Sequence, residues 1–87
     1  MSMLTKKEFK KSKIGVRYNE LKKYGEHIGV RRQGKHIIHL YAYNHFYVEL
    51  WLIISLNQVH WIEVQENDGV IKSYAEDVDI KKNLGLN

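Results

Sequence analysis

Residues 27–66 constrain the fold of this chain more than any other part, because they form four short segments in which apolar and polar residues alternate. A period of two is typical of β-strands with one buried and one solvated face. The third segment breaks the pattern, since almost every residue of 46–54 is apolar. That strand needs cover on both faces, and a chain of 87 residues has little else to provide the second cover.

The alternating segments predict strands joined by short connections, which favours an antiparallel meander. The expected strands are residues 27–31, 35–42, 46–55 and 59–65. Proline is absent, so no residue type in these segments argues against strand pairing.

The register of the sheet follows from which faces must match. Loops of three residues, containing Gly34, Asn44 and Asn57, gather the aliphatic side chains on one face. Two-residue loops would instead place polar residues opposite leucines, with His39 opposite Leu50 and Glu63 opposite Leu52. Burial therefore favours the longer loops. The predicted aliphatic face consists of Ile28, Val30, Ile38, Leu40, Val48, Leu50, Leu52, Ile54, Ile62 and Val64.

The N-terminal segment carries a helix start signal. Thr5 and Glu8 have the spacing of a capping box, so we expect a helix from residue 6 to about residue 13. Apolar residues at helical spacing then predict a further helical stretch, for which Gly25 is a suitable stop. The pattern leaves open whether these stretches are one bent helix or two.

The C-terminal segment carries a second helix signal. Residues 66–69 predict a turn, and Ser73 and Glu76 match a capping box, so we expect a helix over about residues 74–84. The chain is therefore predicted to be a single small α+β domain over residues 1–87. Its architecture is a four-stranded antiparallel β-meander with one or two N-terminal helices and a C-terminal helix.

The second face of the predicted sheet is large, aromatic and only lightly charged. In the chosen register His39 lies opposite Glu49, and Ile53 lies opposite Trp61. Tryptophan and tyrosine are typical anchors of interfaces, and an uncovered patch of this kind exceeds what soluble monomers usually expose. We therefore predict a contact surface made of Tyr41, Tyr47, Trp51, Ile53 and Trp61, with His39 and Glu49 fixing its geometry.

Three interpretations of the second face remain open. Helices from both termini cover both faces of the sheet, or a homodimer or other protein partner covers the aromatic face, or a small-molecule pocket lies between sheet and helix. We favour the second interpretation. The sequence then predicts a small non-catalytic binding or regulatory protein that acts as a homodimer.

Catalytic and metal-binding patterns are weak. His36 and His39 are three residues apart on one strand, so they point to opposite faces and cannot share a metal ion. His39 and Glu49 form the one converging set, with His27 on the same face, and the pair has no certain third ligand for zinc. We expect no metal and no cofactor. A small hydrolase or isomerase that uses His39 and Glu49 for acid–base chemistry remains an alternative.

Nucleic-acid binding is the other alternative, because basic residues are concentrated near the N-terminus. Phosphate contact, rather than recognition of bases, is the expected mode. The candidate stripe on the helical surface consists of Lys6, Lys10, Lys13 and Arg17. Exposed aromatic residues of the sheet offer a second route, the stacking of single-stranded bases, but Glu49 and Glu63 on that face would repel phosphate.

The bulk composition indicates the compartment. The chain has no cysteine, no leader with an apolar core and no apolar run long enough to span a bilayer. We therefore expect a cytoplasmic protein without membrane contact.

Overall fold

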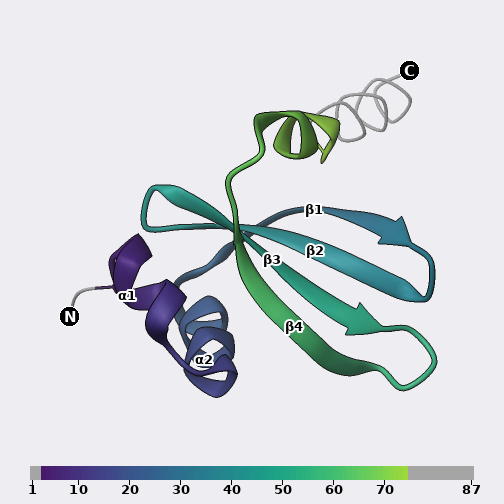
Figure 1. Cartoon of the computed structure of the whole chain (residues 1–87), viewed down its shortest axis with the longest axis horizontal. Helices are drawn as coiled ribbons and strands as arrows, with labels where there is room; N and C mark the ends of the chain where they lie inside the picture. The colour runs from purple at the N-terminus through teal and green to yellow at the C-terminus, as the bar shows by residue number, and fades with distance from the viewer. Residues whose placement is uncertain (1–2, 75–87) are drawn as a thin grey trace.

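The computed structural model describes residues 3–74 and shows an α+β fold, as predicted (Figure 1). Two helices precede a four-stranded antiparallel sheet in which neighbours in sequence are neighbours in space, in the order β1-β2-β3-β4. The elements are α1 (Lys6–Lys11), α2 (Ile14–Tyr24), β1 (Glu26–Gln33), β2 (His36–Tyr43), β3 (Phe46–Ile53) and β4 (Gln58–Gln65). The predicted meander and its strand positions are therefore confirmed.

The N-terminal segment forms two helices, which settles the question that the sequence left open. The capping box is present: the Thr5 hydroxyl accepts the Glu8 N–H at 3.1 Å, and the Glu8 carboxylate accepts the Thr5 N–H at 2.9 Å. Extended backbone at Ser12 and Lys13 separates α1 from α2. The chain leaves α2 at Gly25, where a Cβ would approach the Leu21 carbonyl oxygen to 2.6 Å, so glycine fits this close passage.

The predicted three-residue loops are wrong. Two residues, Asn44 and His45, connect β2 to β3, and both have left-handed backbone with φ of 45° and 70°. Two consecutive left-handed residues form the turn whose twist matches that of the flanking strands, and asparagine tolerates this conformation well. The shorter turn shifts β2 by one residue relative to β3. His39 therefore pairs with Leu50, and the predicted pairing of His39 with Glu49 is also wrong.

A bulge in β4 alters its pairing with β3, from which a four-residue connection, 54–57, leads into it. The pairing shifts between Trp51 and Leu52, so that Trp51 lies opposite Trp61 while Leu52 lies opposite Val59. An extra residue, His60, is accommodated between these two pairs. Leu52 thus pairs with the apolar Val59 instead of His60, which a regular continuation from the Trp51–Trp61 pair would have placed there.

One face of the sheet packs against α1 and α2, and we call it the helix face. Its buried core joins the two helices to three strands and consists of Phe9, Leu21, Tyr43, Val48, Leu50 and Ile62. The other face carries Glu49, Trp51 and the residues paired with them, and we call it the aromatic face. Ile38 and Leu40 pair with Trp51 and Glu49, so they lie on the aromatic face, contrary to prediction.

Residues 68–74 form the described part of a C-terminal helix, which is far from α1 and α2 in Figure 1. It begins earlier than predicted, because the Asn67 side chain accepts the Val70 N–H at 3.1 Å and caps it. Ser73, the predicted cap, instead donates its hydroxyl to the Val70 carbonyl at 2.6 Å. Residues 75–84 of the predicted helix lie outside the described residues.

Candidate functional site

The aromatic face contains a buried carboxylate at the centre of a hydrogen-bonded network. Glu49 on β3 is fully buried and accepts two bonds from the Arg31 guanidinium on β1, at 3.0 and 3.3 Å. It also accepts the Tyr74 hydroxyl at 2.5 Å and the Gln65 amide at 2.9 Å. Three strands and the C-terminal helix therefore meet at one side chain.

The protonation of this network follows from its hydrogen bonds. Burial alone would raise the pKa of Glu49, but the bonds donated by Arg31, Tyr74 and Gln65 outweigh it and hold that pKa below its usual range. Burial and the adjacent Glu49 charge raise the pKa of Tyr74. Glu49 is thus a carboxylate and Tyr74 a neutral phenol at neutral pH. This arrangement suits a fixed structural pair rather than a group that exchanges protons during catalysis.

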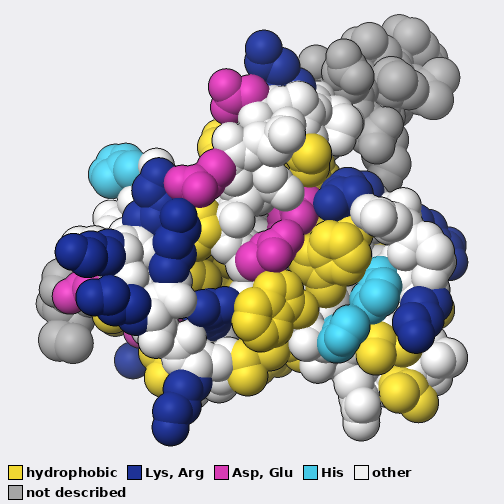
Figure 2. All heavy atoms as spheres, in the orientation of Figure 1, with side chains coloured by type: hydrophobic (Ala, Val, Ile, Leu, Met, Phe, Trp, Pro, Cys, Tyr) yellow, Lys and Arg dark blue, Asp and Glu magenta, His cyan; other side chains and the backbone are white. Residues whose placement is uncertain are grey.

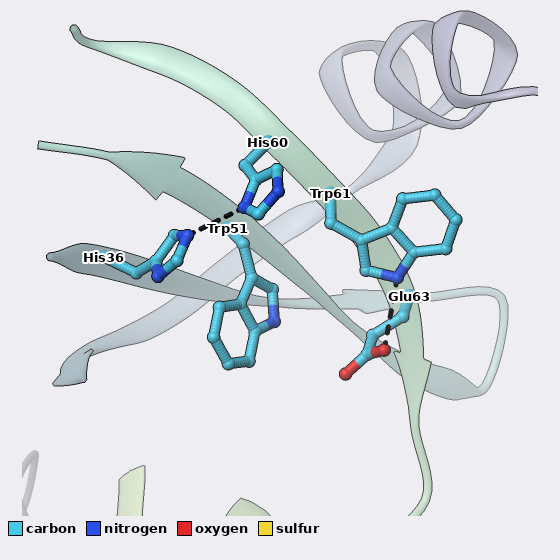
Figure 3. A pocket seen from close by; sticks show the side chains of 5 residues that line it. All are labelled: His36, Trp51, His60, Trp61 and Glu63. Atoms are coloured by element: carbon cyan, nitrogen blue, oxygen red, sulfur yellow. Dashed lines mark hydrogen bonds between the residues drawn. The ribbon is translucent and has the colours of Figure 1, made fainter. Parts of the chain in front are cut away.

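A hollow of about 390 Å³ lies beside this network on the same face (Figure 3). Residues of three strands line it, namely His36, Trp51, His60, Trp61 and Glu63. Figure 2 shows hydrophobic side chains at the centre of the corresponding surface, next to a pair of histidines. The third interpretation of the sequence placed a pocket between sheet and helix, whereas this hollow is lined by strand residues.

Two hydrogen bonds fix the lining of the hollow, and both are drawn in Figure 3. His36 Nε2 and His60 Nδ1 lie 2.7 Å apart, with the ring planes only 9° from parallel. The Trp61 indole N–H donates to a Glu63 carboxylate oxygen at 3.2 Å. Burial first, and then His60 and Lys35, lower the pKa of His36, so this ring is neutral at neutral pH.

The two indoles each lie near an arginine. The Arg31 guanidinium lies 5.5 Å from the Trp51 ring centre, and the Arg17 guanidinium lies 5.3 Å from the Trp61 ring centre. Both distances are within the range of cation–π attraction. The Trp51 indole N–H is buried and has no hydrogen-bond partner among the described residues. Such a group costs about 1–3 kcal/mol, which a partner able to accept this bond would recover.

The structure brings together five of the seven residues predicted for the contact surface. Pairing across β2, β3 and β4 places them on the aromatic face: Tyr47, Glu49, Trp51, Ile53 and Trp61. Tyr41 and His39 lie on the helix face instead, because β2 is shifted by one residue. There the His39 ring meets His27, with a nitrogen–nitrogen distance of 2.9 Å.

The prediction missed the histidines of the hollow and the partners of Glu49. His36 was expected on the face opposite His39 and was not paired with His60, because neither the two-residue turn nor the bulge at His60 is evident from alternation. Glu63 was correctly expected on this face, but not within the contact surface. Pairing Arg31 with Glu49 requires the correct register of all three strands, so no local signal could have found it.

The basic residues proposed for nucleic-acid binding are mostly engaged within the chain. Lys6 and Lys10 form salt bridges with Glu66, at 3.0 and 3.2 Å. Arg17 donates to the backbone carbonyls of Phe9, Lys10 and Ile62 at 3.1, 2.6 and 2.6 Å. Lysine and arginine side chains still gather over α1 in Figure 2. Arg17, however, connects α1 and α2 to β4 through these hydrogen bonds, so its guanidinium is not part of a free basic stripe.

No cluster of three or more potential metal ligands occurs within residues 3–74. Four of the five histidines instead form two separate pairs, one on each face of the sheet. In the same part of the chain, no helix is long and apolar enough to cross a membrane. Comparison with known proteins adds no constraint, since no family model, curated protein or solved structure matches the chain.

Proposed function

We propose that this chain is a small non-catalytic binding protein and that its aromatic face is the contact surface, with a second copy of the chain as the partner. The observation that carries the proposal is the exposure of large aromatic side chains on the face that α1 and α2 leave open. Trp61 is 47% exposed and Tyr47 is 37% exposed. Tryptophan and tyrosine contribute more binding energy per residue than most side chains when a partner buries them.

The exposed apolar surface continues at the end of β3 and β4. The connection between these strands carries Ile54 and Leu56, which are 40% and 59% exposed. Apolar residues in a turn of this kind do not help the monomer to fold, because they remain in water. A two-fold symmetric dimer requires one self-complementary patch, and an exposed sheet face flanked by an apolar turn is suited to that geometry.

The alternatives receive less support from the described residues. The His39–Glu49 pair on which an enzyme would depend is not formed, and Glu49 is held by Arg31 instead. Nucleic-acid binding is less favoured, because Arg17 donates to backbone carbonyls and Lys6 and Lys10 form salt bridges with Glu66. Aromatic anchoring is therefore the function that the arrangement favours, and the cytoplasm remains the expected compartment.

Replacement of Trp61 with lysine tests the proposal. Trp61 is the most exposed tryptophan, so Trp61→Lys should leave the fold intact and dissociate the dimer in sedimentation velocity. Val16→Lys is the matched control, because Val16 is 45% exposed on α2, away from the aromatic face. It should keep the parent's sedimentation behaviour. A parent chain that stays monomeric at high concentration, or equal dissociation by both variants, would reject the dimer.

A further inference from the structure

The hollow on the aromatic face has a lining whose chemistry identifies a class of ligand. Four of its five lining residues are aromatic or imidazole rings, and the fifth is Glu63. Among the described residues, no lysine or arginine lines it. A site with indole rings and one carboxylate attracts positive charge and has nothing to attract a phosphate or a carboxylate.

We propose that this hollow binds an organic cation whose nitrogen carries alkyl groups, such as a trimethylammonium group. Trp51 and Trp61 supply the aromatic surfaces, and Glu63 supplies the counter-charge. The inference goes beyond the proposed dimer, since the isolated chain already presents the hollow. A cation in the hollow and a second copy packed over it would exclude one another.

The hydrogen bonds around the hollow prepare it for such a ligand. The Trp61 N–H holds the Glu63 carboxylate beside the indole, so the negative charge does not have to be ordered when the ligand binds. The contact between His36 and His60 requires one ring N–H to donate a hydrogen bond and the other ring nitrogen to accept it. The His36 imidazole therefore presents a neutral ring surface to the ligand at neutral pH, in agreement with its lowered pKa.

The nearby arginines support the inference and leave room for the ligand. Each indole already has a guanidinium within cation–π distance, at 5.5 Å for Trp51 and 5.3 Å for Trp61. Neither arginine lines the hollow, so the ring surfaces that face it are not occupied by them. Arg31 is neutralised by Glu49, which limits its repulsion of a second cation.

An alkylated nitrogen suits this lining better than a simple ammonium ion. A primary ammonium group is strongly hydrated and needs hydrogen-bond acceptors, and Glu63 is the one carboxylate among the described lining residues. N-alkyl groups spread the charge and have apolar surface that matches indole rings. A volume of about 390 Å³ falls within the usual range for small-ligand sites.

Choline and its neutral tert-butyl analogue provide the test, since the two have nearly the same shape and differ in charge. Titration of the full chain, monitored by two-dimensional NMR, should show that choline shifts the indole signals of Trp51 and Trp61. The neutral analogue should bind with at least about 5-fold lower affinity. Glu63→Gln should weaken choline binding by about 3-fold or more and leave the neutral analogue unchanged. Equal binding of both compounds to the monomeric chain, or no binding of either compound to it at millimolar ligand concentration, would overturn the inference.

Two further measurements separate this inference from the dimer. Trp61→Phe keeps an aromatic ring and should retain part of the choline affinity, whereas Trp61→Ala should lose about 5-fold or more. Sedimentation of the same samples reports the dimer independently. Absence of choline binding at protein concentrations where sedimentation shows only monomer would reject the cation site alone, and choline binding by a chain that remains monomeric at high concentration would reject the dimer alone.

Discussion

The two faces of the sheet are closed in different ways. On the helix face, Phe9 and Leu21 from the two helices are buried against apolar strand residues. The Phe9 ring centroid lies 5.2 Å from that of Tyr43 and 5.7 Å from that of Phe46. The aromatic face is closed at one end by the charged pair of Arg31 and Glu49, and its other end is the open hollow. The first arrangement provides stability, and the second leaves surface available for binding.

The contrast has an energetic basis. Apolar burial on the helix face is favourable without any particular orientation of charges. A buried ion pair gains little net stability, because the desolvation of both charges offsets their attraction. It is, however, costly to break. Glu49 therefore orients Arg31, Gln65 and Tyr74 more than it drives folding. These hydrogen bonds hold the side chains next to the hollow in fixed positions.

The largest expected effect is on the helix face. Phe9→Ala should lower the free energy of unfolding by about 3–5 kcal/mol, because it removes a fully buried ring and leaves a cavity. Chemical denaturation followed by circular dichroism measures this loss. Trp61→Ala is the comparison on the aromatic face, where half-exposure should keep the loss below about 1 kcal/mol. Similar losses from the two substitutions would contradict the proposed difference between the faces.

Breaking the buried pair should have the next largest effect. Arg31→Met leaves the Glu49 charge without its cation and should cost about 3 kcal/mol, the lower end for buried pairs because Tyr74 and Gln65 still donate to Glu49. Combining it with Glu49→Leu removes the stranded charge and should recover most of the loss in the same denaturation assay. A double variant no more stable than Arg31→Met would show that packing, and not charge, explains the effect.

Acid should weaken the aromatic face selectively. The pKa of Glu49 in the folded chain lies below its unfolded value of about 4.5, so its contribution is complete above pH 4.5 and is lost as pH falls through the folded-state pKa. The free energy of unfolding should therefore decrease below about pH 4.5 more steeply in the parent than in Glu49→Gln. Denaturation curves collected between neutral and acidic pH test this, and parallel pH profiles would contradict it.

The outline of the fold could be predicted from local sequence signals, and the detailed register could not. Alternation located the four strands, and the Thr5–Glu8 capping box located α1, because both signals depend on neighbouring residues. The face to which each β2 side chain points depends on whether the turn at Asn44 and His45 has two residues or three. A period of two makes that one residue decisive for every side chain of the strand.

The candidate site shows the same division. Trp51 and Trp61 were correctly placed on one face, because the observed pairing of β3 with β4 differs from the predicted one by two residues, and a shift of two keeps every side chain on its face. The bulge that brings His60 to His36 is a feature of strand pairing, so the sequence of β4 alone does not reveal it. The network at Glu49 depends on three elements at once and was beyond local reasoning.

The smallest expected effect concerns an exposed counterpart of the buried pair. Glu66 bridges Lys6 and Lys10, but all three side chains are about half exposed, with 49–52% of their surface in water. Water screens such pairs, and ordering the long side chains offsets the attraction. Glu66→Gln should therefore leave the unfolding midpoint unchanged within error, in contrast to Arg31→Met. A clear loss of stability would show that the contact between α1 and the end of β4 contributes more to folding than its exposure indicates.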